Sequence, residues 1–154
     1  MGCDIHSRCE VFNPVTNTWE TMGEIFPLEE FGQKYSKRDC SVEPFGNRNY
    51  GMFGFLAGVR NMAECKPLSY PRGLPPDSPN SGWEDGGYLG DHSFSWFLLS
   101  ELLAFDYSQK FPNRRHNEIE TYADLVGEEF FKSLEILKTL GPPEHVRLLF
   151  GFDS

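Results

Sequence analysis

Apolar and polar residues alternate through residues 3–12, close to the start of the chain. Successive side chains of an extended chain point to opposite faces, so this spacing predicts a β-strand with one largely apolar face and one polar face. The apolar face carries the odd-numbered residues Cys3, Ile5, Ser7, Cys9 and Val11, and the polar face carries Asp4, His6, Arg8 and Glu10. Turn-forming residues at 13–17, followed by TWETMGE at 18–24, predict that the strand continues into a β-hairpin.

Helices are expected in four places. Residues 48–61, RNYGMFGFLAGVRN, repeat apolar side chains at intervals of three and four despite three glycines. A short helix is expected at 27–35, another at 99–105, and the longest helix at 123–140, where GPP at 141–143 ends it. The apolar segment 145–154 predicts a final strand that lies against the first strand.

Strands at both ends with helices between them indicate an α+β fold in one domain, residues 1–154. We expect a small sheet built from the amino-terminal hairpin and the carboxy-terminal strand, helices packed on one face, and long ordered loops. Residues 66–90 are rich in proline and glycine yet contain Tyr70, Trp83 and Tyr88, which favours an ordered loop covering a site. A polar insert at 107–122 precedes the longest helix, and both Arg114–His116 and that acidic helix are interpreted as solvated surface.

Charge and cysteine content narrow the function. The net charge of −9 disfavours binding of extended nucleic acid, although a few arginines can still hold a small anion. No signal segment and no long apolar run is visible, so we expect a cytoplasmic protein without membrane contact. The four cysteines form no CxxC pair and are interpreted as reduced and mostly buried.

Several motifs together resemble an uncharacterised family found in bacteriophage and bacterial genomes. The matching segments are MGCDIH at Met1–His6, RNY…LAGVR at Arg48–Arg60, PRGLP at Pro71–Pro75, HSFSW at His92–Trp96, EL at Glu101–Leu102 and VRLLFGFD at Val146–Asp153. The resemblance spans the chain and implies a phage origin, hence the host cytoplasm, but it brings no activity with it. Leu98 departs from the pattern, because family members tend to have a threonine there as a helix N-cap.

Two histidines suggest acid–base chemistry on a phosphodiester. His6 and His92 could act as base and acid on either side of the phosphorus, with Asp4 fixing a tautomer. Ser93 and Ser95 would bind phosphate oxygens, aided by amides at the start of the following helix. The alternative is a hydrogen-bonded polar cluster and a simple capping turn.

Arginines and aromatic residues supply candidate ligand contacts. The anion-binding candidates are Arg48, Arg60, Arg72 and Arg147. Tyr50 and Trp96 are candidates for stacking on a base, together with Trp83 and Tyr88. Each arginine alone is more often part of a salt bridge, and each aromatic residue is more often part of the core.

A metal site is a further alternative on the same strand. Aspartate and histidine two positions apart can both reach one divalent cation, and the loop before residue 93 could complete the site. The candidate ligands are Asp4, His6, Glu10, Asp91 and His92. The sequence does not require a metal.

Three functions remain open from the sequence. The first is cleavage of a phosphodiester in a nucleotide-like small molecule, which in a phage protein would inactivate a host immune signal. The second is sequestration of such a molecule without turnover, and the third is a structural or interaction protein. An exposed edge at either terminal strand would also allow a homo-oligomer.

Overall fold

The chain folds around a four-stranded antiparallel sheet with the strand order β2-β1-β8-β5. The computed structural model describes residues 2–22, 29–30, 33–34, 44–79 and 89–154. The strands of this sheet are β1 (Asp4–Asn13), β2 (Thr18–Met22), β5 (His92–Leu98) and β8 (Val146–Asp153). Four helices accompany it, α1 (Tyr50–Ala57), α2 (Leu99–Ala104), α3 (Tyr122–Val126) and α4 (Glu128–Leu137), with a 3-10 turn η2 at Pro143–His145. The predicted α+β class is confirmed.

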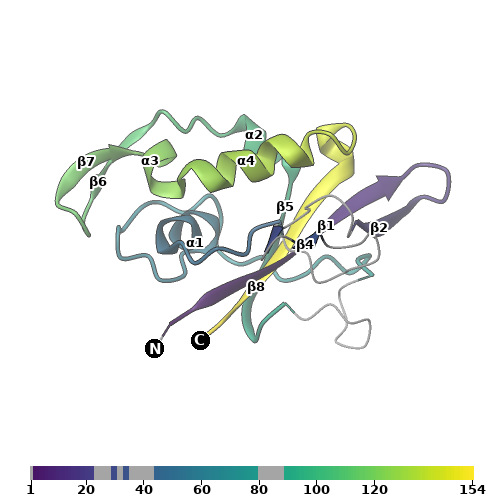
Figure 1. The fold of residues 1–154 in the computed structure, drawn as a ribbon, viewed down its shortest axis with the longest axis horizontal. Coiled ribbons are helices and arrows are strands. Elements are labelled where there is room, and N and C mark those ends of the chain that lie inside the picture. The colour runs from purple at the N-terminus through teal and green to yellow at the C-terminus, as the bar shows by residue number, and fades with distance from the viewer. Residues whose placement is uncertain (1, 23–28, 31–32, 35–43, 80–88) are drawn as a thin grey trace.

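The two ends of the chain form the centre of the sheet. β1 pairs with β8 from Asp4 opposite Asp153 to Val11 opposite Val146, so the segments farthest apart in sequence lie side by side (Figure 1). β8 is buried at every position except Asp153, as expected for a central strand covered on both faces. The predicted hairpin and the predicted carboxy-terminal strand are therefore confirmed, whereas the edge strand β5 was expected only as a lead into the helix at 99.

One face of the sheet packs against the helices. The side chains of Phe150 and Phe152 on β8 join the core, and the Phe53 ring of α1 meets Phe152 at a centroid distance of 5.1 Å. The Phe55 ring lies in a cluster of aromatic rings that includes Phe105 just after α2, Tyr122 of α3 and Phe130 of α4. The abundant phenylalanine of the sequence therefore fills the layer between sheet and helices.

The predicted long helix at 123–140 is two helices. Gly127 interrupts it at φ +80°, a backbone conformation that favours glycine, and separates α3 from α4. Thr121 caps α3 by accepting from the amide of Asp124. The apolar spacing continues through 123–140, but the N-cap at Thr121 and the left-handed conformation of Gly127 divide the segment into two helices.

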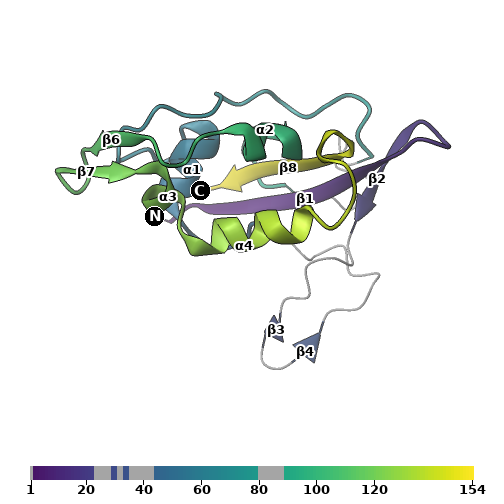
Figure 2. The same cartoon turned by 90° about the horizontal axis from the view of Figure 1, so that it is seen from above.

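Two further segments differ from their predictions. Within the predicted helix at 27–35, the structure describes only β3 (Glu29–Glu30) and β4 (Gln33–Lys34), which pair as antiparallel strands, so the prediction is wrong for these four residues. So short a segment gains too little from helix formation to resist strand pairing. The polar insert at 107–122 contains a hairpin, β6 (Lys110–Asn113) and β7 (Glu118–Thr121), at the opposite end of the molecule from the β1–β2 hairpin (Figures 1 and 2).

No helix in the described ranges is both long and apolar enough to cross a bilayer. Buried thiols agree with the interpretation of the cysteines, because Cys3, Cys9 and Cys65 are all buried and unpaired by disulfides. Cys40 lies outside the described residues.

Candidate functional site

The inner half of the polar strand face is a buried ion-pair network. Arg147 donates from Nε to Glu10 Oε1 at 2.6 Å and from Nη1 to Asp77 Oδ1 at 2.9 Å. Ser78 donates to the other oxygen of Glu10 at 2.5 Å, and the guanidinium of Arg147 lies 4.0 Å from the centroid of the Trp19 ring. Glu10 is fully buried and Arg147 is 3% exposed. The predicted metal ligand Glu10 and the predicted anion clamp Arg147 instead bind each other and attach residues 77–78 to the sheet.

The outer half of the same face carries His6 and Asp4, and each of them has another residue at hydrogen-bond distance. His6 Nε2 lies 2.5 Å from Asp153 Oδ2. Asp4 accepts two hydrogen bonds from Arg48, at 2.9 and 3.0 Å. The hydrogen bonds from Arg48 hold the pKa of the Asp4 carboxyl below its ordinary value. Asp153 is thus the carboxylate paired with His6, and Arg48 is engaged with Asp4.

The two histidines point to opposite faces of the sheet. His6 pairs with Gly151 of β8, whereas His92 pairs with the next residue, Phe152, whose side chain belongs to the core. Directly paired residues place their side chains on the same face of the sheet, and successive residues of a strand alternate between faces. The partners of His6 and His92 are successive residues of β8, so the two imidazoles lie on opposite faces. The His92 ring stacks on Phe152, and its nitrogens contact the hydroxyls of Ser93 and Ser154, each at 2.9 Å. The geometry does not bring His6 and His92 together as an acid–base pair.

The described residues also contain no group of three or more His, Cys, Asp or Glu side chains able to hold a metal ion. Glu10 lies in the buried network, Asp91 is exposed, and the two histidines are on different faces. We therefore do not base a function on the predicted cation site.

The predicted phosphate contacts before α2 have structural roles. Residues 92–98 form a strand, not a capping turn, so Ser93 and Ser95 precede the helix by several residues. Ser95 is fully buried and its hydroxyl accepts from the amide of Arg72 at 3.0 Å. Glu101 accepts from the amide of Leu98 at the start of α2, whereas Leu98 lacks the side-chain acceptor that a threonine would offer to the first-turn amides.

Arg72 is likewise used internally. It donates twice to Glu101, at 2.8 and 2.9 Å, and once to the carbonyl oxygen of Trp96. Its guanidinium lies over the Phe97 ring at 4.5 Å and over the Trp96 ring at 5.4 Å. Arg72 and Trp96 therefore bind one another. Trp83 and Tyr88 lie outside the described residues.

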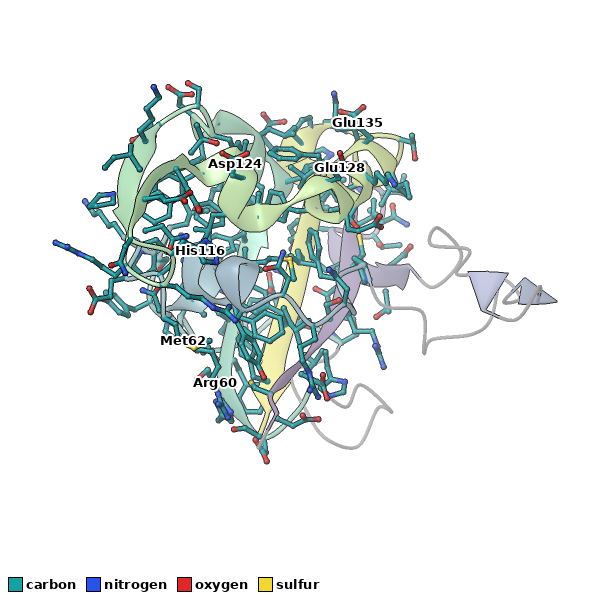
Figure 3. All side chains as sticks on the ribbon, turned by 60° about the vertical axis from the view of Figure 1, so that its left-hand side comes forward. Arg60, Met62, His116, Asp124, Glu128 and Glu135 are labelled. Carbon is teal, nitrogen blue, oxygen red and sulfur yellow. The ribbon has the colours of Figure 1, made fainter. Side chains whose placement is uncertain are left out.

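Two of the predicted ligand contacts, Tyr50 and Arg60, do meet at a pocket. This pocket has a volume of about 230 Å³ and lies between α1, the segment 60–63, the β6–β7 hairpin and α3. The Arg60 guanidinium lies 5.8 Å from the centroid of the Tyr50 ring, and the Tyr50 hydroxyl accepts from the amide of Cys3. Tyr50 thus supports Arg60, instead of offering that ring face to a base. Figure 3 shows His116, Met62 and Arg60 below Asp124 on one side of the molecule, farther from Glu128 and Glu135 on α4 than Asp124 is.

The opposite wall comes from the turn of the β6–β7 hairpin. Asn113, which is 2% exposed, accepts from the amides of Arg115 and His116 and donates to Glu120 Oε2 at 2.7 Å. The other oxygen of Glu120 lies 2.8 Å from His116 Nδ1. A carboxylate only accepts, so this contact places a proton on Nδ1 and leaves Nε2 as the unprotonated nitrogen of the neutral ring. The pocket therefore contains an oriented imidazole.

The charges around the pocket are unevenly paired. Both acidic side chains of the lining are engaged, Glu120 as above and Asp124 by the amide of Thr121. Within the described part of the chain, neither Arg60 nor Arg115 forms an ion pair with a carboxylate. Two guanidinium groups are thus available to an anion that enters this pocket.

The hairpin residues were missed because Arg114–His116 were interpreted as solvated surface and no strand was predicted in the polar insert at 107–122, although the sequence contains a signal. The first hairpin turn, Asn13–Asn17, and the second, Asn113–Asn117, share the pattern N-x-x-x-N followed by a glutamate three positions later. In both turns the first asparagine accepts from two turn amides and donates to that glutamate. Where the second turn has His116, the first has Thr16.

Comparison with models of protein families, with curated proteins and with solved structures gave no match for this chain. The pocket residues and their geometry are the basis on which we infer a function.

Proposed function

We propose that the protein binds a small phosphorylated, nucleotide-like molecule in the pocket between α1, α3 and the β6–β7 hairpin. The observation that carries this proposal is the pair of guanidinium groups, Arg60 and Arg115, that line one pocket without a carboxylate partner among the described residues. In a chain of net charge −9, cations left available in a concave site favour an anionic ligand.

The pocket volume limits the ligand. At about 230 Å³ it is smaller than the roughly 300–1,000 Å³ of pockets that enclose drug-sized molecules. It has room for a phosphate and a sugar, with a base at the mouth, but not for both halves of a dinucleotide. The ligand class is therefore a mononucleotide or a molecule of similar size.

Binding of a ligand in this pocket is better supported than acid–base catalysis by His6 and His92. His6 and His92 lie on opposite faces of the sheet, each in contact with a residue at the end of β8 or beyond it. The pocket needs neither of them. Removal of a nucleotide signal from a host cell, the role that fits the phage resemblance, would begin with this binding step.

The test is calorimetric titration of the protein with AMP, ribose 5-phosphate, inorganic phosphate and cyclic di-AMP. Arg115→Gln is the informative variant, and Arg114→Gln is its matched control. Arg114 is the adjacent turn residue, loses the same charge when substituted, and lines the other side of the hairpin instead of this pocket. A hydrogen bond to a charged group is worth about 1.5–3 kcal/mol, so Arg115→Gln should weaken AMP binding roughly 10-fold to 100-fold.

The expected order of affinity is AMP above ribose 5-phosphate above phosphate, with each affinity falling as salt is added. Cyclic di-AMP should bind no more tightly than AMP. Equal losses for Arg115→Gln and Arg114→Gln would show that only the overall charge matters, and the pocket would then not be the site. Absence of binding by all phosphorylated probes would refute the proposal.

A further inference from the structure

We infer that His116 and Glu120 make this pocket hydrolytic, and that its substrate class is a phosphodiester of mononucleotide size, a cyclic nucleoside monophosphate. His116 would be the general base and Glu120 the residue that positions it. This inference rests on the proposed binding function, because the substrate must first occupy the same pocket.

The arrangement of the pair supports a base in the pocket. His116 Nδ1 is directed at Glu120 Oε1 at 2.8 Å, and Glu120 is held from its other oxygen by the buried amide of Asn113. The His116 side chain is 54% exposed while that of Glu120 is 17% exposed, so the carboxylate is the enclosed member and the imidazole is the accessible one. Within the described residues no partner occupies Nε2 of His116. An imidazole held in one tautomer with an accessible Nε2 is what proton transfer requires.

Both hairpin turns contain the asparagine–glutamate contact, but only the second turn adds a histidine to it. Asn13 and Glu20 repeat the asparagine–glutamate contact in the first turn, at 3.0 Å, where Thr16 stands in place of histidine. That contact is therefore a property of the turn. The second turn adds an imidazole to it and places the group in the wall of a pocket that also contains Arg60 and Arg115.

The reaction follows from these positions. The guanidinium groups bind the phosphate oxygens, and a water molecule lies between the phosphorus and His116 Nε2. The water oxygen forms a bond to phosphorus as its proton moves to Nε2, and the bond from phosphorus to one ester oxygen breaks with its electron pair moving to that oxygen. The ester oxygen takes a proton from solvent, and the imidazolium of His116 returns its proton to solvent. The product is the opened nucleoside monophosphate.

The size of the pocket selects this class of diester. A cyclic mononucleotide has its diester within a single nucleotide, whereas a dinucleotide would leave half its atoms outside a pocket of about 230 Å³.

The experiment follows both binding and product with 2′,3′-cyclic AMP and 3′,5′-cyclic AMP as probes. Calorimetry gives the dissociation constant, and chromatography with mass detection gives the rate of AMP formation. The variants are His116→Gln, Glu120→Gln and the double substitution. His145→Gln is the control, because His145 belongs to η2 and does not line the pocket. Urea unfolding of each variant checks that the hairpin remains folded.

We expect His116→Gln to lower kcat about 100-fold to 10,000-fold while changing the dissociation constant less than about 3-fold. Glu120→Gln should lower kcat by a smaller factor, and the double variant should be no slower than His116→Gln, since the two residues act as one unit. A structural role of Glu120 alone would not produce this lack of additivity.

Other results separate the two proposals. Binding of intact cyclic nucleotide without product, or full activity in His116→Gln, would overturn the hydrolytic inference and leave the binding function in place. If neither probe binds nor reacts and AMP also fails to bind, the binding function is refuted and the inference is refuted with it.

Discussion

The buried pair of Glu10 and Arg147 offers the sharpest test of how the sheet is stabilised. Arg147→Met removes the cation and leaves the fully buried carboxylate of Glu10 with Ser78 as a donor. Loss of one partner of a buried ion pair costs about 3–5 kcal/mol, because the remaining charge cannot return to water. The bond to Asp77 adds little, since that carboxylate is largely exposed.

Urea unfolding followed by circular dichroism measures this cost. With a slope of about 2 kcal/mol per molar urea, the midpoint of Arg147→Met should fall by roughly 2 M. The double variant Glu10→Gln with Arg147→Met removes the uncompensated charge but keeps an acceptor for Ser78. The double variant should therefore recover about half of the midpoint shift of Arg147→Met. Its midpoint should differ clearly from the value expected if the effects of the two single substitutions added.

A matched control is the ion pair between Arg48 and Asp4, because Asp4 lies on β1 as Glu10 does. Arg48→Met breaks the two hydrogen bonds to Asp4, which have similar lengths but lie at the exposed end of β1. Solvent screening makes such a pair weak, so the midpoint of this variant should hardly move. If Arg147→Met shifts the midpoint no more than Arg48→Met does, or if the double variant is additive, burial is not what gives the pair its strength.

Three further predictions concern acid sensitivity, thiol reactivity and close packing. Burial pushes the pKa of Glu101 up, but hydrogen bonds from Arg72 and the amide of Leu98 outweigh it and hold the pKa below its ordinary value of 4.5. The stability lost in Glu101→Gln should therefore be largest above pH 4.5 and should shrink as the pH falls through the lower folded-state pKa. Urea midpoints of both proteins between pH 7 and pH 3 measure this difference. A difference that grows in acid would contradict the prediction. Burial raises the pKa of the Cys65 thiol to about 11, so iodoacetamide at pH 8 should label this thiol only after the protein unfolds. Peptide mass mapping detects the label. Rapid labelling of the native protein would contradict the prediction, because it would show that the thiol is accessible. A side chain at Gly151 would clash with the carbonyl oxygen of Leu89, so Gly151→Ala should lower the melting temperature by several degrees in a calorimetric scan. An unchanged melting temperature would show that the backbone at Leu89 does not lie against β8.

Much of the fold was predictable from local pattern. The alternation at residues 3–12, the turn that follows it and the apolar final segment gave a hairpin and a strand that the structure confirms. Helical spacing at 48–61 gave α1, and Gly58 ends that helix in a left-handed conformation. Such features depend on side chains within one or two turns of the chain, so the sequence contains them directly.

The pocket wall was partly predictable as well. The pattern that identified the first turn at Asn13–Asn17 recurs at Asn113–Asn117, and the same pattern predicts a second hairpin. What the repeated pattern does not contain is the environment of each turn. Glu20 is exposed in the first hairpin, whereas Glu120 is mostly enclosed in the second.

The alternation of residue types is enough to predict that one face of β1 is polar and that Asp4, His6 and Glu10 share it. The partners of these side chains depend on the tertiary fold. Glu10 meets Arg147, 137 positions away, and His6 meets Asp153, 147 positions away, so neither partner is visible in the local pattern. The pairing register of β8 then places His6 and His92 on opposite faces. Whether a polar side chain faces a ligand or an internal partner depends on strand pairing between distant segments, because a shift of one residue reverses the face that every side chain occupies.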